Sequence, residues 1–188
     1  MKRIGITGSL ASGKTTASKI LSSQNGPLFS ADNVVKNLYK KKNFKKLILR
    51  KFAISNHINL KKTLKNKIIK NSTNIKKLEK IIHPLVRKEM LKFAKINKSK
   101  KFVFFEIPLL VESKLMKNFD IIFFIKTKRS VRLKRFKTKG GDEKLFNTLD
   151  KKQIPDKKKI KYCDHIIVNE NNLKILKKKL LDIFSRYV

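Results

Sequence analysis

The chain has 188 residues, 40% of them hydrophobic, which suffices for one domain, or one domain with an insertion, and its formal net charge at pH 7 is +36. A single cysteine, Cys163, excludes an internal disulfide and favours a reducing compartment. The apolar runs are shorter than the roughly 20 residues of a membrane helix, and a candidate strand begins within two residues of Met1. We therefore expect a cytoplasmic protein without a membrane span, signal peptide or transit peptide.

The first predicted elements are a strand, a helix and a second strand. Residues 3–7, RIGIT, predict a short buried strand, and residues 14–23 predict a helix that is broken before NGP at 25–27. The tripeptide LFS at 28–30 predicts the second, short strand.

A long helical stretch follows. Apolar spacing predicts helices over residues 33–52 and from residue 60 to about 96. Within the second stretch, His83 is expected to end a helical run, because the residue before a proline avoids helical backbone angles. We interpret this stretch as a helical insertion that carries a second binding surface.

The remaining elements alternate between strands and helices. Continuous apolar runs at 101–108 and 119–127 are typical of central strands in a parallel sheet, which are buried on both faces. A basic helix is predicted at 129–139, a last strand at 165–169 and a final helix at 171–187. The expected apolar face of the final helix is formed by Leu173, Leu176, Leu180, Phe184 and Tyr187. This alternation predicts an α/β fold with a parallel sheet.

The loop between the first strand and the first helix matches the pattern G-x-x-x-x-G-K-[ST] without departure. Its residues are Gly8, Ser9, Leu10, Ala11, Ser12, Gly13, Lys14 and Thr15, followed by Thr16. Glycine permits the backbone angles and the close approach that let N–H groups and the helix N-terminus face a phosphate. Lys14 places a positive charge at the β- and γ-phosphates, and the Thr15 hydroxyl is a candidate Mg²⁺ ligand. We therefore expect a nucleoside triphosphate, and the absence of an Asn-Lys-x-Asp motif argues against a GTPase.

Further motifs follow the phosphate loop in a characteristic order. They are FSADNVV at 29–35, IIHPLVRKEM at 81–90, FEIPLLVES at 105–113, SVRLKRFKTKGG at 130–141 and DKKQIPDKKKIKYCDHIIVNENN at 150–172. In this order and spacing, nearly the whole chain resembles the dephospho-coenzyme A kinase family. The resemblance implies ATP and dephospho-coenzyme A (dephospho-CoA) as substrates, Mg²⁺ as the metal, and the ribose 3′-hydroxyl as the phosphate acceptor.

The resemblance also implies an architecture. It is a three-layer P-loop kinase fold with a five-stranded parallel sheet, and we expect a monomer or a weak homo-oligomer. Its expected parts are a core at about 1–32 and 99–188, a helical substrate-binding insertion at about 33–98 and a lid at about 128–160.

Asp32 is the candidate catalytic base. It follows the second predicted strand, at the edge where ligands bind in open α/β sheets, and a carboxylate there can accept the proton of a hydroxyl and aim its oxygen. The sequence SADN is also typical of a helix N-cap, which is the competing interpretation. By resemblance, Asp32 is the second aspartate of an Asp-Ala-Asp motif, in which Ser30 replaces the first. Whether Ser30 substitutes by hydrogen bonding, or a carboxylate that assisted Mg²⁺ is lost, stays open.

Arg135 and Lys139 lie four residues apart, so they are expected on one face of the basic helix. By resemblance, this region covers the ATP phosphates, and Arg135 would stabilise charge on the transferring phosphoryl group. Lys139 stands where the family usually has arginine, and it keeps the charge but loses the bidentate fork. A solvated basic face is the alternative for both residues.

The resemblance places an acceptor pocket at residues from two regions. They are Lys61, where the family has arginine, His83, Pro108, Leu109 and Glu112. For His83 a packed or capping role is the alternative, and for Glu112 the capping of a loop.

Other polar residues are less specific. Glu106 either reaches Mg²⁺ through water or only faces solvent at the end of a strand, and Gln153 and Lys159 match family positions near the lid. His57, His165 and Cys163 do not form a convincing metal set, since the Cys-Asp-His spacing is too tight for zinc, and we interpret them as structural.

Two other functions stay open. One is a small phosphate-loop kinase with a different nucleoside or nucleotide acceptor. The other is a nucleic-acid-binding protein that uses ATP as a switch, in keeping with 49 basic against 13 acidic residues. However, only seven of the basic residues are arginine, and lysine is spread along the chain beside many Ile, Asn and Phe residues, as a strongly A/T-biased genome would produce. We therefore expect no specific nucleic-acid partner.

Overall fold

The computed structural model describes residues 1–55, 59–71 and 73–188, which are divided between two units. Unit 1 consists of Met1–Ala31 and Lys92–Val188, and unit 2 is Asp32–Leu91. Unit 1 contains the sheet, whereas the regular structure of unit 2 is helical. Across the described ranges, no helix combines the length and the apolar character that a membrane span needs.

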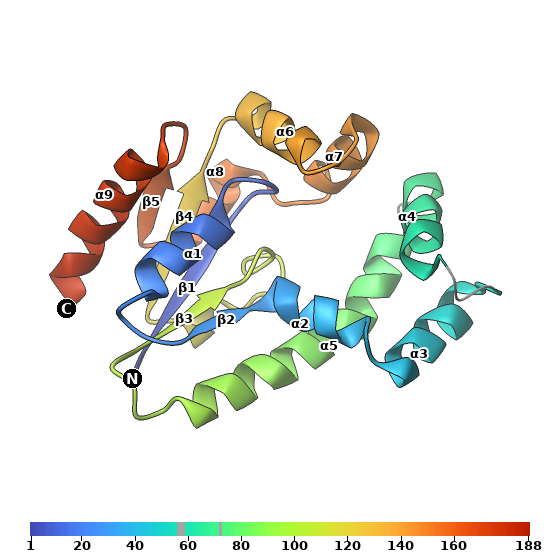
Figure 1. The fold of residues 1–188 in the computed structure, drawn as a ribbon, viewed down its shortest axis with the longest axis horizontal. Helices are drawn as coiled ribbons and strands as arrows, with labels where there is room; N and C mark the ends of the chain where they lie inside the picture. Colours follow the sequence, from blue (N-terminus) through green and yellow to red (C-terminus); the bar gives the residue numbers. More distant parts are fainter. Residues whose placement is uncertain (56–58, 72) are drawn as a thin grey trace. The chain divides into compact units, whose positions relative to one another are not determined.

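The sheet of unit 1 has five strands, all parallel, in the order β2-β3-β1-β4-β5 (Figure 1). The strands are β1 (Lys2–Gly8), β2 (Leu28–Ser30), β3 (Phe102–Glu106), β4 (Ile121–Lys126) and β5 (His165–Val168). Every residue of β3 is buried, as are the first five of β4, which is why these strands are continuous apolar runs. The predicted five-stranded parallel sheet is confirmed, and it brings the carboxyl ends of all strands to one edge.

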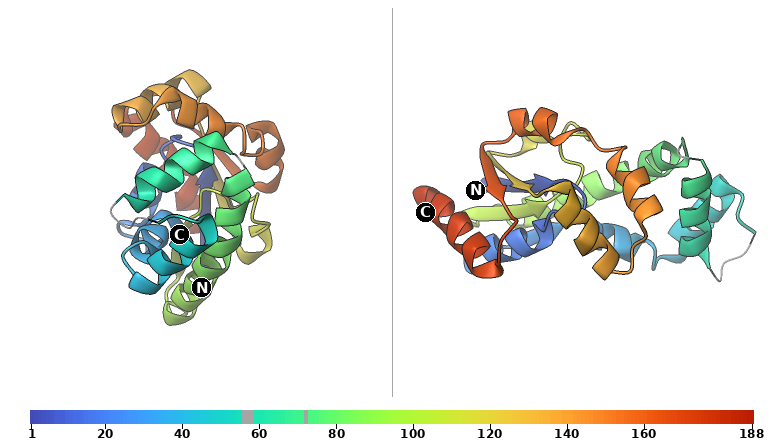
Figure 2. Two further views of the ribbon diagram at one scale, coloured as in Figure 1. Left: turned by 90° about the vertical axis from the view of Figure 1, so that its right-hand side faces the viewer. Right: turned by 90° about the horizontal axis from the view of Figure 1, so that it is seen from above.

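Helices cover both faces of the sheet. On one face, α1 (Lys14–Ser22) and α9 (Leu173–Phe184) pack on the strands through a shared apolar cluster that includes Leu21, Phe104 and Leu180. On the other face, the rings of Phe29 and Phe105 contact Phe93, near the C-terminal end of α5 (Thr73–Ile96). The right-hand view of Figure 2 shows α1 and α9 on one side of the sheet and α8 (Asp156–Lys159) on the other. The predicted three-layer α/β arrangement is therefore present.

Two further helices of unit 1 follow β4. They are α6 (Arg129–Thr138) and α7 (Glu143–Asp150), and both fall within the range predicted as a lid. Phe136 of α6 packs against Phe146 of α7 with ring centroids 5.6 Å apart. Phe146 is fully buried, so the two helices form one packed pair.

Unit 2 has a hydrophobic core of its own. Its helices are α2 (Ala31–Leu38, whose first residue belongs to unit 1), α3 (Lys42–Phe52), α4 (Leu60–Lys70) and most of α5. The buried residues of this core are Leu38, Phe44, Ile48, Leu49, Phe52, Ile54, Leu60, Leu64 and Ile82. The predicted helix over 33–52 is wrong in its continuity, because the chain turns at Tyr39–Lys41 between α2 and α3. This turn lets Leu38 and Phe44 contribute to the same core.

Two other details of the helices differ from the sequence prediction. Pro84 lies inside α5, so His83 does not end a helical run. A proline inside a helix removes one backbone hydrogen bond and its ring crowds the preceding turn, which together typically cost about 3 kcal/mol, and the packing of Ile82 and Leu85 on the core of unit 2 offsets this cost. Leu173 was expected on the apolar face of α9 but is 61% exposed, because it is the first residue of the helix and lies beyond the edge of the core.

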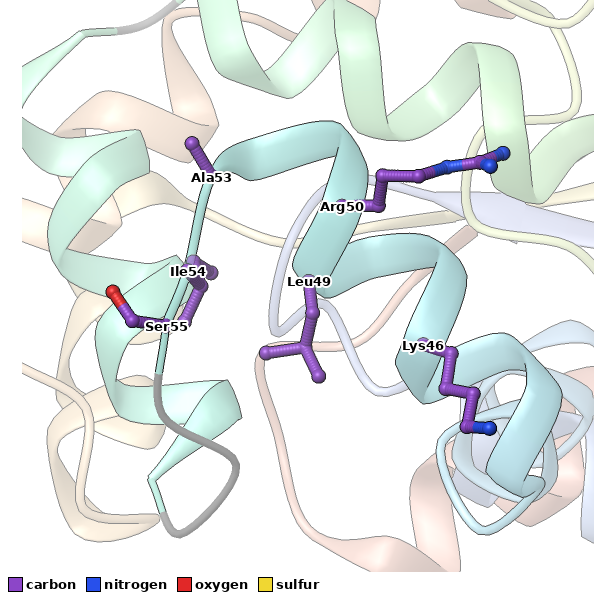
Figure 3. Close-up of a pocket in the computed structure, with 6 residues that line it drawn as sticks. All are labelled: Lys46, Leu49, Arg50, Ala53, Ile54 and Ser55. Carbon is purple, nitrogen blue, oxygen red and sulfur yellow. The ribbon is translucent and has the colours of Figure 1, made fainter.

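Unit 2 also has a shallow pocket of about 510 Å³ on α3 and the segment that follows it (Figure 3). The residues that line it are Lys46, Leu49, Arg50, Ala53, Ile54 and Ser55. None of the predicted site residues is among them. We therefore assign no role in phosphate transfer to this pocket.

Candidate active site

The phosphate loop connects β1 to α1 at the carboxyl edge of the sheet. Its backbone takes positive φ angles at Gly8 (150°), Ala11 (58°) and Gly13 (97°). A Cβ atom on Gly8 would lie 2.5 Å from the carbonyl oxygen of Ile125, and one on Gly13 would collide with Asn169 Nδ2. Both glycines are therefore required by the fold itself, by backbone angle and by space.

One carbonyl of the loop is held from three directions. The oxygen of Ser12 accepts hydrogen bonds from Thr127 Oγ1 at 3.0 Å, Asn169 Nδ2 at 2.8 Å and Arg135 Nη1 at 3.4 Å. Because the C=O and N–H of a trans peptide point in opposite directions, this arrangement turns the N–H of Gly13 away from the three donors. A backbone N–H that is oriented in this way can donate to a phosphate.

Lys14 is the first residue of α1 and is 7% exposed. Its ammonium group donates to the carbonyl oxygen of Ser9 at 2.8 Å. The positive charge is thus held within the loop, where a triphosphate would place its terminal phosphates.

Thr15 and Glu106 form a pair of oxygen groups beside the loop. The Thr15 hydroxyl donates to Glu106 Oε1 at 2.5 Å, and Glu106 is 2% exposed at the end of β3. The interpretation of Glu106 as a solvent-facing strand end is therefore wrong. In the sheet register, Glu106 is paired with Ser30 of β2. An aspartate at position 30, as in the family, would place a second carboxylate beside Glu106 on the neighbouring strand. With Ser30 at this position, Glu106 is the only carboxylate of this strand pair.

Arg135 and Lys139 differ in their surroundings. Arg135 contacts the phosphate loop through the Ser12 carbonyl, whereas Lys139 is exposed and lies one residue beyond the end of α6. The helix ends there because Gly140 takes a left-handed angle (φ 79°) and the N–H of Gly141 bonds to the carbonyl of Phe136. Lys139 is thus the C-cap of α6, four residues after Arg135, and their common face stays a prediction.

Arg132 is a site residue that the sequence analysis did not single out. It is buried, its Nη1 lies 2.6 Å from Asp150 Oδ1 of α7, and it donates to the carbonyl oxygens of Thr127 and Leu10. Arg132 thus ties the pair of α6 and α7 to the phosphate loop. The available signal was the Arg-Leu-x-Arg motif, of which the sequence analysis used only the second arginine. Thr127 and Asn169, which hold the Ser12 carbonyl, directly follow β4 and β5.

The loop after β3 holds the other predicted residues of unit 1. Pro108 and Leu109 are half-buried, and the carbonyl of Pro108 accepts a hydrogen bond from Thr7 Oγ1 at 3.3 Å. Glu112 lies further along the loop, where its Oε1 accepts from the N–H of Ile154 at 3.2 Å. Gln153 Oε1 accepts from the N–H of Leu10, at 3.0 Å. Glu112 thus holds another loop, and Gln153 lies against the phosphate loop.

Three predicted residues belong to unit 2. Asp32 is exposed and lies inside the first turn of α2, whose first residue is Ala31, so it is not the N-cap itself. Lys61 is exposed on α4, with its ammonium 5.6 Å from the centre of the Tyr39 ring. His83 is half-buried in the middle of α5. Their roles toward a substrate stay predictions.

His165 and His57 were interpreted as structural rather than metal-binding residues. His165 packs on Phe123 and its Nε2 lies 2.5 Å from the Tyr187 hydroxyl. Within residues 1–55, 59–71 and 73–188, no group of three His, Cys, Asp or Glu side chains could hold a metal ion. His57 lies outside the described residues.

Cys163 is expected to react slowly with thiol reagents. Burial, and next the Asp164 carboxylate, raise the pKa of its thiol from 9.0 to about 12, which makes the reactive thiolate about 10³-fold scarcer near pH 8. Modification by an aromatic disulfide reagent, followed with and without denaturant, measures this difference, and equal rates would contradict it. Because the pKa is raised, the unfolded chain loses its proton first, and the free energy of unfolding falls as pH rises from 9.0 toward 12.

Comparisons with known proteins agree with this geometry. The family model described as dephospho-CoA kinase matches residues 2–174. The chain belongs to the dephospho-CoA kinase family. A dephospho-CoA kinase of Bartonella quintana is 35% identical over 191 residues, which cover 98% of this chain and 97% of the relative.

Solved structures support the fold of the family. TT1252 from Thermus thermophilus superposes with a TM-score of 0.78 at 22% identity, covering 100% of this chain and 98% of the other. The dephospho-CoA kinase from Campylobacter jejuni gives a TM-score of 0.64 at 24% identity, with 99% and 97% covered.

Proposed function

We propose that the protein transfers the γ-phosphoryl group of ATP to the ribose 3′-hydroxyl of dephospho-CoA, which yields coenzyme A and ADP. The observation that carries the proposal is a complete phosphate loop, with its lysine ammonium held in place, inside a family match over residues 2–174. Phosphoryl transfer requires mainly positioning and charge stabilisation, and the loop is built for both.

On the donor side, the backbone N–H groups of the loop bind the ATP phosphates. The binding residues are Gly8, Ala11, Ser12, Gly13, Lys14, Thr15 and Thr16. Lys14 and Arg135 stabilise the charge that develops on the transferring group. Arg135 is already hydrogen-bonded to the loop, whereas Lys139, beyond the end of α6, contributes charge without a fixed geometry. The range 128–160 acts as the lid that excludes water.

The pair of Thr15 and Glu106 fits Mg²⁺. Both present oxygen atoms, and they are already within 2.5 Å of each other. Mg²⁺ takes one or two protein oxygens and completes its octahedral shell with water and substrate phosphates. Thr15 would be a direct ligand, and Glu106 would bind through water. When bound, the ion neutralises charge on the β- and γ-phosphate oxygens.

On the acceptor side, Asp32 accepts the proton of the 3′-hydroxyl. Lys61 and His83 from unit 2, with Pro108, Leu109 and Glu112 from the loop after β3, bind dephospho-CoA. In support of this proposal, Asp32 follows β2 by two residues, and β2 pairs with β3 at the edge where parallel sheets bind ligands.

The test is an acceptor screen. ADP formation from ATP and Mg²⁺ is measured with dephospho-CoA, AMP, CMP, adenosine and pantetheine phosphate. The proposal expects turnover with dephospho-CoA and none with the others. Turnover with a different acceptor would support the ATP-binding role of the phosphate loop but reject dephospho-CoA as the acceptor. Nucleic-acid binding with a steep salt dependence, without turnover of any acceptor, would favour a nucleic-acid-binding protein that uses ATP as a switch.

Replacing Glu106 by glutamine is expected to raise the Mg²⁺ concentration for half-maximal activity by about 10-fold. The amide oxygen still accepts from Thr15, but the negative charge that orders metal-bound water is lost, and such partners typically contribute 10- to 100-fold in metal affinity. A Mg²⁺ titration at saturating ATP measures the change. Asp182→Asn, at an exposed position of α9, is the matched control, and identical titration curves for the two variants would contradict the metal role.

The proposal includes a cytoplasmic location and a monomer or weak homo-oligomer. Both substrates are polar small molecules, so the reaction needs no membrane partner. Light scattering across a range of protein concentrations determines the oligomeric state.

A further inference from the structure

A buried ion pair connects the loop after β3 to α8. The ammonium of Lys159, whose side chain is fully buried, lies 2.6 Å from Oε1 of Glu112, whose side chain is 14% exposed. The contact is a charge contact without the angle of a hydrogen bond, and Glu112 Oε2 is buried with no hydrogen-bond partner among the described residues. Desolvating two charges is costly, and apolar residues of similar volume often stabilise a fold equally well. A contribution to stability is therefore a weak explanation for the presence of an ion pair at this position.

The pair fixes the segment Gln153–Asp156. Glu112 Oε1, which contacts Lys159, also accepts the hydrogen bond from the N–H of Ile154. Lys159 lies at the end of α8, which begins at Asp156. The segment is thus attached to the pair at both of its ends.

The same segment contacts the phosphate loop at two consecutive residues. Gln153 Oε1 accepts from the N–H of Leu10, and the Asp156 carboxylate accepts from the hydroxyl of Ser9. Ser9 is itself buried, and its carbonyl oxygen accepts from the Lys14 ammonium at 2.8 Å. A continuous series of contacts therefore runs from Lys159 to Lys14.

We infer that Glu112 and Lys159 are a positioning pair for Lys14, acting through the Gln153–Asp156 segment and Ser9. This inference rests on the proposed function, since Lys14 is assigned to the ATP phosphates. Neither residue of the pair needs to touch a substrate in this role. Their charges lock the segment, the segment fixes Ser9, and Ser9 holds the ammonium at one place in the loop.

The inference predicts a specific pattern of kinetics. Lys159→Met is expected to lower kcat by about 10²-fold, the effect of a displacement of about 1 Å in a reacting group. Asp156→Ala breaks the same series at another contact, so it is expected to have a similar effect, and Asp156→Asn recovers most of the loss because an amide oxygen still accepts from Ser9. The double variant Asp156→Ala/Lys159→Met is expected to be no slower than either single one, because the two residues act on the same group.

The experiment measures kcat, thermal unfolding and the affinities for ATP and ADP for each variant. Lys158→Met, on the same short helix but exposed, is the control and should match the wild type. Effects on kcat that multiply in the double variant, or a lowered unfolding temperature with unchanged kcat per folded molecule, would overturn the inference. If Lys159→Met does not fold, the comparison of alanine with asparagine at the half-buried Asp156 decides the question.

The binding measurements separate this inference from the proposed function. Lys14 contacts the terminal phosphates, so displacing it should weaken ATP binding more than ADP binding. The ratio of the affinities for ATP and ADP can be measured without the acceptor substrate. A wild-type chain that fails to phosphorylate dephospho-CoA would reject the proposed function, whereas an unchanged ATP-to-ADP ratio in the variants would reject the positioning pair.

Discussion

Replacing Asp32 by asparagine is expected to lower kcat by about 10²–10⁴-fold, the range that general base catalysis typically contributes. The amide is nearly isosteric with the carboxylate, but it cannot accept the proton of the acceptor hydroxyl. Asp32 is exposed in the first turn of α2, so the change should cost less than about 1 kcal/mol of stability, the usual value of a helix-dipole contact. Steady-state kinetics with dephospho-CoA, together with direct measurement of ATP binding, check the prediction.

The control for this variant is its neighbour. Asn33→Ala changes an exposed polar residue of the same helix turn and should keep kcat near the wild-type value. A kcat for Asp32→Asn within tenfold of the wild type would assign Asp32 to helix stabilisation and leave the acceptor without an identified base.

Gly13→Ala is expected to destabilise the protein by about 2–5 kcal/mol and to abolish ATP binding. A left-handed backbone angle costs a residue with a Cβ about 1–2 kcal/mol. The added carbon also collides with Asn169 Nδ2, whose hydrogen bond to the Ser12 carbonyl would be lost, typically about 1–3 kcal/mol more for a buried group. Chemical denaturation and nucleotide titration measure the two effects.

Gly140 provides a matched control for Gly13. It also has a positive φ, 79°, but a Cβ atom there would meet nothing within 4 Å. Gly140→Ala should therefore lower the free energy of unfolding only by the cost of a left-handed backbone angle, about 1–2 kcal/mol, and leave ATP binding intact. Equal losses for the two variants would show that the contact with Asn169 has no role in shaping the loop.

The sheet could be predicted from the sequence because its central strands are continuous apolar runs. The runs that form β3 and β4 are short, apolar and buried along almost their whole length, as expected for central strands of a parallel sheet whose two faces are both covered. The phosphate loop could be predicted because positions 8 and 13 both require glycine, for a positive φ and for lack of space. This requirement places two glycines at a recognisable spacing in the sequence.

What the sequence did not predict depends on tertiary contacts. The turn between α2 and α3 and the passage of α5 through Pro84 both depend on how apolar residues share the core of unit 2. Arg132 looks like any residue of a basic helix, and only the fold brings Asp150 and the Leu10 carbonyl to it. The different surroundings of Arg135 and Lys139 also depend on the fold, because Arg135 bonds to the Ser12 carbonyl whereas Lys139 is the exposed C-cap of α6.

The convergence of three donors on the Ser12 carbonyl has a consequence for folding. Two of them, Thr127 and Asn169, lie 115 and 157 residues away along the chain. Contacts of such sequence separation form only after the intervening chain has closed, which is entropically costly and slow. The phosphate loop is complete in the sequence at residue 15, but the side chains that hold its Ser12 carbonyl come from residues that follow β4 and β5. We therefore expect nucleotide binding to appear late in folding, and a chain truncated before Asn169 to contain the whole motif without binding ATP.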